Sequence, residues 1–250
     1  MQTQSTTPLF RHVDRWSGVT VIVPLHNYAG FIGDKLNSVL DQTLDDVSLV
    51  VVDDASTDES AAVVQRWMEQ FHDRFGACLL VANDRNARLA VTRNTGAALT
   101  PSPLLFFLDA DNLLYPRCLE RHAAVLHARP DVAGAYSLIE IFDGEAGIMG
   151  GEVFSRDRFR YGNHVDAMAM IRRSALEAMD GYRHIQFGWE DYDLWLRMVE
   201  AGETMLQIPA VLSRYRVHGQ SMLRSLTNVN NNHVELRADM VQRHPWLDLD

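Results

Sequence analysis

The sequence contains only two cysteines, Cys78 and Cys118, among its 250 residues. Two unpaired thiols exclude a disulfide framework or a cysteine-rich zinc site, and they favour a reducing compartment. The sequence also lacks an uninterrupted apolar run of about 18 residues and an apolar signal core near its N-terminus. We therefore expect a soluble, cytoplasmic protein without a transmembrane segment, and peripheral association with the inner face of the membrane stays open.

Basic residues are scarce relative to acidic ones. The sequence has 23 Lys and Arg against 33 Asp and Glu, which gives a formal net charge of -10 at pH 7. This charge opposes non-specific binding to nucleic acid, so we expect no nucleic-acid partner. It would also repel an anionic nucleotide, unless a bound cation or a local cluster of basic groups compensates for it.

Hydrophobic residues make up 47% of the chain, which is enough for a substantial buried core. In the first half, short apolar runs alternate with stretches whose apolar residues recur at helical spacing. This alternation predicts an α/β fold with a Rossmann-like mixed sheet, flanked by helices, in a single continuous domain. The predicted strands of this half occupy residues 19–24, 47–54, 77–82 and 103–108.

Particular residues mark the starts of two predicted helices. Ser56 with Glu59 three residues later has the spacing of a capping box, which predicts a helix from there through Phe71. Pro116 is typical of the first helical turn, so a helix is expected to begin there. The remaining elements are helices from about residues 31, 86, 174 and 190, strands near 132–141 and 205–216, and a Gly-rich turn at 144–151.

Acidic pairs follow two of the predicted strands. Asp53-Asp54 and Asp109-Ala110-Asp111 should both lie at the carboxyl edge of the sheet, where open α/β sheets bind ligands. Asp-x-Asp at the end of a strand offers two hard oxygen ligands that suit Mg²⁺ or Mn²⁺. Asp53-Asp54 can alternatively form a turn and cap a helix, and this interpretation remains open.

Six segments make the pattern specific. They are VIVPLHN, VVDDASTDES, TRNTGAA, FFLDADN, FGWEDYDLWLRMVEAG and YRVHGQS, in this order between residues 19 and 221. The set resembles the family-two glycosyltransferases of GT-A-type fold. The resemblance implies inverting transfer of a sugar from a nucleoside-diphosphate sugar, usually UDP-linked, to a hydroxyl of a glycan or other acceptor, with Mn²⁺ or Mg²⁺ on the diphosphate.

The resemblance also implies roles for residues on the donor side. Pro24 and Asp54 match nucleoside contacts, with Asp54 similar to the carboxylate that accepts a hydrogen bond from uracil. His26 stands where the family often has Tyr stacked on the base, and an imidazole ring can also stack. Arg93 matches an Arg near the nucleotide, and Asp109 resembles the ribose-side acid.

Three further residues complete the implied site. Asp111 resembles the direct metal ligand, and His218 matches a His that completes metal or diphosphate binding. Glu190-Asp191 resembles the acidic pair at the start of an acceptor-side helix, where Asp191 is the implied catalytic base. A carboxylate within hydrogen-bond reach can take the proton of the attacking hydroxyl. Simple helix capping is the alternative for this pair.

The resemblance divides the chain into functional segments. Residues 19–112 form the nucleotide-sugar half and residues 113–222 the acceptor-binding and catalytic half, preceded by an extension at 1–18 and followed by a helical segment at 223–250. Two other functions remain to be separated from transfer. One is a catalytically idle sugar-nucleotide-binding domain. The other is a haloacid-dehalogenase-type phosphatase, although Asn112-Leu113 departs from the Thr or Val that usually continues its motif.

Overall fold

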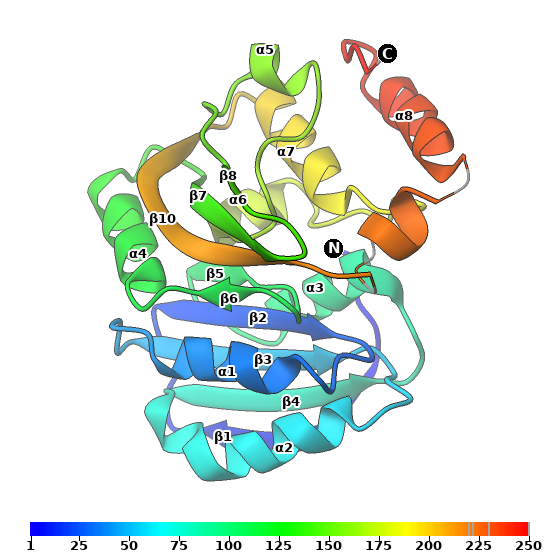
Figure 1. The fold of residues 1–250 in the computed structure, drawn as a ribbon. Helices are drawn as coiled ribbons and strands as arrows, with labels where there is room; N and C mark the ends of the chain where they lie inside the picture. The colour runs from blue at the N-terminus through cyan, green and yellow to red at the C-terminus, as the bar shows by residue number, and fades with distance from the viewer. Residues whose placement is uncertain (220, 222, 230, 250) are drawn as a thin grey trace.

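The computed structural model describes residues 1–219, 221, 223–229 and 231–249. Gln220, which belongs to the YRVHGQS segment, lies outside the described residues. The strands are Thr6–Val13 (β1), Val19–Leu25 (β2), Val47–Asp53 (β3), Ala77–Asn83 (β4), Leu104–Phe107 (β5), Leu113–Leu114 (β6), Gly134–Asp143 (β7), Gly147–Met149 (β8), Ala169–Arg172 (β9) and Met205–Val217 (β10). They form one mixed sheet in the order β1-β4-β3-β2-β5-β9-β7-β10-β6, with β8 paired to β7 (Figure 1).

The first part of the sheet is parallel. β2 pairs in parallel with β3 on one side and with β5 on the other, and β3 pairs in parallel with β4. Every residue of β2 and β3 is buried. Strands covered on both faces need apolar side chains at consecutive positions, which is why these strands appear in the sequence as nearly continuous apolar runs.

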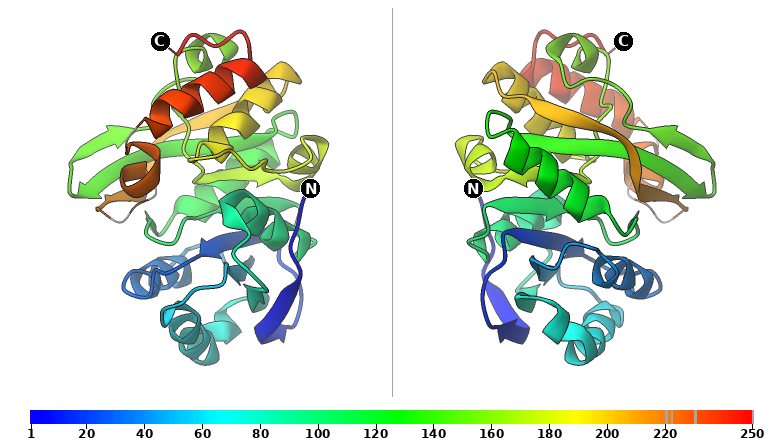
Figure 2. Two further views of the ribbon diagram at one scale, coloured as in Figure 1. Left: turned by 90° about the vertical axis from the view of Figure 1, so that its right-hand side faces the viewer. Right: turned by 90° about the vertical axis from the view of Figure 1, so that its left-hand side faces the viewer.

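Helices cover both faces of this sheet (Figure 2). They are Ile32–Leu40 (α1), Ser60–Phe71 (α2), Arg88–Ala98 (α3), Cys118–Ala128 (α4), Arg156–Phe159 (α5), Arg173–Ala178 (α6), Glu190–Glu200 (α7) and Asn232–Arg243 (α8), with a 3-10 turn at His72–Arg74 (η1) and a π turn at Leu223–Thr227 (η2). α1, α2 and α4 pack into one apolar cluster, and α3, α6 and α7 into a second. Within β2, Val21 joins the first cluster and Ile22 the second, because successive strand side chains point to opposite faces.

α3 packs unusually close to the sheet at Gly96. A Cβ atom at this position would lie 2.4 Å from Ile22 Cγ2, closer than real Cβ contacts allow. A larger residue would therefore push α3 away from β2. The same helix carries Arg93 and Asn94, whose contacts organise the candidate site.

The predicted mixed sheet with flanking helices is confirmed, but two predicted helix starts were wrong. α2 begins at Ser60 rather than Ser56, whose Oγ instead accepts a hydrogen bond from the Asn27 backbone N–H at 3.0 Å. Asp58 Oδ1 accepts from the Ser60 N–H at 2.9 Å, so an Asp satisfies the helix start that the capping-box spacing assigned to Ser56. α4 begins at Cys118, two residues after Pro116.

Four strands lie where the sequence pattern indicated none: β1, β6, β8 and β9. β1 occupies part of the segment 1–18 and pairs antiparallel with β4, although most of its residues are exposed or half-buried. β8 lies within the predicted Gly-rich turn at 144–151 and pairs with β7. β1 and β8 are peripheral, and their exposure leaves no continuous apolar run to find, whereas β6 has two residues and the buried β9 four, too few for a period to show.

The two cysteines are free and buried, as expected from their number. Among the residues that the structure describes, no helix is long and apolar enough to cross a membrane.

Candidate functional site

The parallel strands bring the acidic pairs to one edge. β3 and β5 flank β2 on its two sides, so the segments that follow all three strands leave the same carboxyl edge of the sheet. Asp54 directly follows β3, and Asp109 lies two residues after β5. The expected convergence of the two acidic segments is therefore present in the fold.

Asp54 is built into the start of α3. Its Oδ1 accepts hydrogen bonds at 2.7 Å from both Asn83 Nδ2 and the Ala87 N–H, and its Oδ2 accepts from the Arg88 N–H at 3.0 Å. A carboxylate suits the positive end of the helix dipole. Three of its roughly four acceptor positions are thus engaged within the protein. Asp53 fills the turn role, since its Oδ2 accepts from the Ser56 N–H at 3.1 Å.

His26 lies against this acidic segment. Its Nδ1 lies 2.8 Å from the backbone oxygen of Asp54, and an oxygen can only accept, so Nδ1 carries the proton. The amides of Asn27 and Asn86 lie 3.3 and 3.4 Å from its Nε2. Pro24 is buried within β2, two residues before this ring.

Arg93 forms the buried centre of the site. Its side chain is 2% exposed, and its Nη2 donates to Asp109 Oδ1 at 2.7 Å. The guanidinium also lies over the Tyr182 ring, 5.1 Å from the centroid. Asn94 holds this ring in place through two hydrogen bonds with the backbone of Tyr182. The site thus contains a permanent buried cation, the local compensation that the acidic composition requires.

Asp111 and His218 are in contact although 107 positions separate them in the sequence. Asp111 Oδ2 lies 2.9 Å from His218 Nε2, and both side chains are nearly buried. Arg216 Nε donates to the Asp111 backbone oxygen at 3.1 Å and supports the same segment. Burial and the nearby Asp109 raise the pKa of Asp111, whereas the His218 hydrogen bond opposes this rise.

The donor set of this pair fits a divalent metal. Carboxylate oxygen and imidazole nitrogen suit Mn²⁺, and carboxylates suit Mg²⁺. Among the described residues, the buried Nδ1 of His218 has no hydrogen-bond partner. The other ring nitrogen, Nε2, is the one that faces the carboxylate, 2.9 Å from Asp111 Oδ2. Asp111 and His218 are therefore the residues that could hold the metal implied by the sequence, with Asp109 adjacent.

Glu190 and Asp191 open α7 directly after a strained turn. Phe187, Gly188 and Trp189 have φ values of 75°, 115° and 69°, and Trp189 is the N-cap residue without a side-chain cap bond. Left-handed conformations cost about 1–3 kcal/mol for non-glycine residues and concentrate at functional sites. Trp189 packs edge-on against Tyr192, with centroids 5.7 Å apart.

The two acids of α7 lie close to the donor-side groups. Burial raises the pKa of Asp191, opposed by Arg93, and Asn163 Nδ2 donates to Asp191 Oδ2 at 3.0 Å. Burial also raises the pKa of Glu190 to about 7, again opposed by Arg93. Asp109 contributes to both shifts. The charge of Arg93 therefore acts both on Asp109, through a direct ion pair, and on the pKa values of the two acids of α7.

The sequence did not indicate several further groups near Asp109 and Asp191. Burial, Asp109 and Asp191 together raise the pKa of Asp166 to about 7. Burial and the surrounding aspartates also raise the pKa values of Tyr28 and Tyr215. Asp166 stands alone in the sequence, whereas Tyr28 directly follows VIVPLHN and Tyr215 opens YRVHGQS, where neither ring was given a role.

Lys35 was missed although the sequence carried a signal. It is the only lysine in the chain and occupies a position between Ile32, Leu36 and Val39 on the buried face of α1. A charge within an apolar helical stripe is a sign of a buried, partnered group. Its fully buried Nζ donates to the Leu108 backbone oxygen at 2.5 Å, directly before Asp109.

Lys35 predicts a pH dependence of stability. Burial lowers its pKa from 10.5 to about 7, although Asp109 and Asp111 oppose the shift. Between these two values the unfolded chain holds a proton that the folded chain lacks, so stability rises with pH. We expect the free energy of unfolding, relative to a Lys35→Met variant, to rise by up to about 1.4 kcal/mol per pH unit across this window.

Denaturant unfolding of both proteins in chelator, from pH 6 to 10.5, measures this difference. The difference in free energy of unfolding should not change with pH below about pH 7, where Lys35 is protonated in both the folded and the unfolded state. A difference that stays constant between pH 7 and 10 would mean that Lys35 keeps its charge in the fold.

The chain matches known proteins over most of its length. The model of "Glycosyl transferase family 2" matches residues 20–180. The Bacillus subtilis (strain 168) protein EpsE, named as a glycosyltransferase, is 28% identical over 220 residues, which cover 82% of this chain and 75% of EpsE.

Two solved structures share the fold. S. aureus TarS 1-349 in complex with UDP-GlcNAc has a TM-score of 0.75 and 18% identity, covering 93% of this chain and 68% of TarS. Mannosyltransferase PcManGT from Pyrobaculum calidifontis, in complex with GDP-Man and Mn2+, has a TM-score of 0.69 and 22% identity, covering 91% of this chain and 65% of PcManGT. These likenesses confirm the predicted GT-A-type fold.

Proposed function

The chain belongs to glycosyl transferase family 2, and we propose that it transfers a sugar, with inversion, from a UDP-linked donor to a hydroxyl of a glycan or other acceptor. One observation carries this proposal. The pairs Asp109–Arg93 and Asp111–His218 lie at one edge of the sheet, and Asp191 is close enough to both Asp109 and Arg93 for these charges to shift its pKa. This arrangement supplies groups for the diphosphate and a base for the acceptor.

Asp111 and His218, with Asp109 beside them, are proposed to hold Mn²⁺ or Mg²⁺. The bound ion would neutralise negative charge on the departing diphosphate. PcManGT, whose structure contains GDP-Man and Mn2+, supports the use of a divalent metal. Arg93 adds a permanent positive charge within the same crevice, because its buried guanidinium stays protonated beside Asp109.

Asp191 is proposed to act as the general base. The acceptor oxygen bonds to C1 of the sugar, the bond between C1 and the diphosphate oxygen breaks, and the hydroxyl proton passes to the Asp191 carboxylate. Burial strengthens this carboxylate as a base, and Asn163 orients it by donating to Oδ2. Glu190 is the neighbouring candidate, and burial raises its pKa to about 7, which leaves it partly protonated at neutral pH.

A donor assay tests the function directly. The protein is incubated with Mn²⁺ and a panel of UDP- and GDP-linked sugars, with simple glycosides as acceptors, and released nucleoside diphosphate is measured together with the glycoside product. Turnover of a UDP-linked sugar supports transfer. Tight donor binding without any released diphosphate would instead identify a catalytically idle binding domain.

We further expect UDP to bind more tightly than GDP in competition calorimetry with Mn²⁺ present. One acceptor position of Asp54 Oδ2 remains for a base N–H, and the half-buried His26 ring is available for stacking. Asp54→Asn should reduce this preference, with its melting temperature measured in parallel because the same carboxylate holds the start of α3. Tighter binding of GDP would overturn the base assignment alone.

A further inference from the structure

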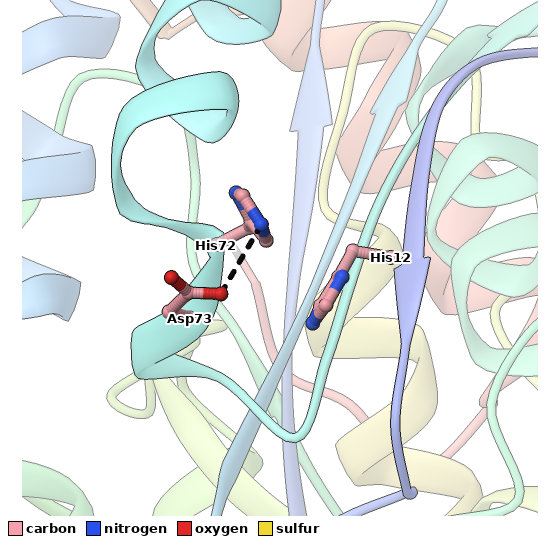
Figure 3. Close-up of side chains that lie close together, drawn as sticks. All are labelled: His12, His72 and Asp73. Carbon is pink, nitrogen blue, oxygen red and sulfur yellow. Dashed lines mark ion pairs between the residues drawn. The ribbon is translucent and has the colours of Figure 1, made fainter.

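A group of side chains that could hold a metal ion lies at the opposite ends of the parallel strands from Asp109 and Asp111. It comprises His12 in β1 and His72 and Asp73 in η1 (Figure 3). β1 runs antiparallel to β4, and His12 pairs with Cys78 near the start of that strand. The cluster therefore lies at the amino ends of the parallel strands, whereas Asp109 and Asp111 follow a carboxyl end.

Strand alternation explains how His12 reaches η1. Phe10 and His12 are two residues apart in β1 and so point to the same face of the sheet. Phe10 packs against the apolar cluster beneath α2, and its ring lies 5.7 Å from that of His72. His12 stands next along this face, and its ring meets the His72 ring edge-on with centroids 4.4 Å apart.

The ligand atoms of the three residues converge. One nitrogen of each imidazole and one Asp73 oxygen all lie within 4.8 Å of one another. His72 Nε2 is 3.2 Å from Asp73 Oδ1, the contact drawn in Figure 3. Asp14 adds a second carboxylate, whose Oδ2 lies 3.3 Å from His12 Nε2.

The tautomer of His72 directs a lone pair into this cluster. Its Nδ1 lies 3.0 Å from the Met68 backbone oxygen, which can only accept, so Nδ1 carries the proton and Nε2 of the neutral ring is free to bind a cation. A backbone carbonyl on the second ring nitrogen is the usual support of a metal-binding histidine. The buried Nε2 of His12 lies 3.3 Å from Asp14 Oδ2, but within the described part of the chain it makes no contact with the geometry of a hydrogen bond.

We propose that His12, His72 and Asp73, with Asp14 as a fourth ligand, bind a Zn²⁺ ion or a similar transition-metal cation. Two imidazoles with carboxylates form a donor set for Zn²⁺ rather than for Mg²⁺ or Ca²⁺, which prefer oxygen alone. Two carboxylates also balance the charge of a divalent ion.

The cluster can close around such an ion with small movements. Bonds of about 2.0–2.2 Å to zinc require the ligand atoms to approach more closely than they do in the free protein. The carboxylates can supply this movement, because the Asp14 and Asp73 side chains are 77% and 90% exposed. The imidazoles are already packed against the fold and need to move least.

The bound ion would clamp β1 to the end of α2. β1 is the edge strand of the sheet, and beyond its pairing with β4 it makes few contacts with the helices. A metal joining β1 to η1 adds a second attachment to this edge. The site is separate from that of the nucleotide and selects a softer cation than Mn²⁺ or Mg²⁺.

The experiment titrates Zn²⁺ into the metal-free full chain by calorimetry, and Co²⁺ with visible absorption to report tetrahedral coordination. The titrations are repeated with Asp111→Ala, which removes binding at the nucleotide site. Three double variants then combine Asp111→Ala with one further change each: His12→Asn, His72→Asn or the exposed control His127→Asn. We expect one equivalent of Zn²⁺ to remain in Asp111→Ala and in the control. Its affinity should fall at least tenfold to a hundredfold in the other two variants, because losing even a supporting group costs about this much.

Thermal melts provide the independent measurement. Zn²⁺ should raise the melting temperature of Asp111→Ala but not of the variant that also carries His12→Asn, while circular dichroism shows that both are folded. Sugar transfer by His12→Asn alone should equal that of the unmodified chain, so this test does not depend on the proposed function. Absence of Zn²⁺ binding in Asp111→Ala, or undiminished binding in both histidine variants, would overturn the proposal.

Discussion

Replacement of Asp191 by Asn should lower the rate of sugar transfer by about 10²- to 10⁴-fold, the usual cost of losing a general base. The amide keeps the size of the side chain and can still interact with Asn163, but it cannot accept the proton of the attacking hydroxyl. Donor binding should be retained, because Asp109 and Asp111, proposed to act on the donor side, follow β5, whereas Asp191 belongs to α7.

Transfer rate and donor affinity are measured in parallel for Asp191→Asn and for a control, Asp34→Asn. Asp34 is an exposed aspartate in the first turn of α1, so its replacement reproduces the loss of a charge near a helix N-terminus. If Asp191 only favoured the start of α7, Asn would serve nearly as well and both variants would remain active. Transfer within about threefold of the unmodified chain, roughly 0.7 kcal/mol in the barrier, would exclude Asp191 and leave Glu190.

The pH profile provides a second test of the same assignment. Burial raises the pKa of Asp191, so the active, ionised carboxylate should be lost as pH falls through a value above that of a free Asp. The acidic limb of the transfer rate should therefore lie at higher pH than an exposed carboxylate would give.

Replacement of Asp111 by Ala should abolish the metal dependence of UDP binding. The variant removes a nearly buried carboxylate and leaves His218 without its partner, so we expect the affinity for UDP with Mn²⁺ to fall at least tenfold. Without the cation, the diphosphate faces the acidic crevice with Arg93 as its main compensation.

Calorimetry with UDP, with and without chelator, measures this effect, and Asp34→Ala is the matched surface control. The unmodified chain and the control should lose affinity when chelator is added, whereas Asp111→Ala should show little further change. His218→Ala should behave like Asp111→Ala if both residues hold the ion. Equal UDP affinity in chelator for the unmodified chain would exclude the metal from donor binding.

The clearest sequence signals came from residues with local constraints. β2 and β3 are buried on both faces, and such strands must be apolar at consecutive positions. The acids that follow β3 and β5 were located because a strand end fixes the edge of the sheet on which the next residues lie. By contrast, β1 has a half-exposed side-chain pattern and could not be distinguished from an extended tail.

The hydrogen-bond and charge partners of the site residues, however, were decided by the tertiary structure. The carboxylate of Asp54 accepts hydrogen bonds from the backbone amides that start α3, contacts that no spacing in the sequence indicated. Lys35 and Asp166 became part of the site only because the fold brings α1 and the segment before β9 near Asp109, where burial shifts both pKa values. No spacing in the sequence carries that information.

The sequence by itself determined the α/β class, the buried parallel strands of the first half and the family resemblance. It also located the acids that follow strands and those that begin α7. All of these depend on local periodicity and on short motifs. Only the tertiary structure decided that Arg93 pairs with Asp109 and that His218 meets Asp111 across 107 positions of sequence. It also placed His12 against His72. Contacts between distant segments depend on how helices pack on a sheet, and a charge at such a contact acquires its partner and its pKa from groups that no nearby residue specifies.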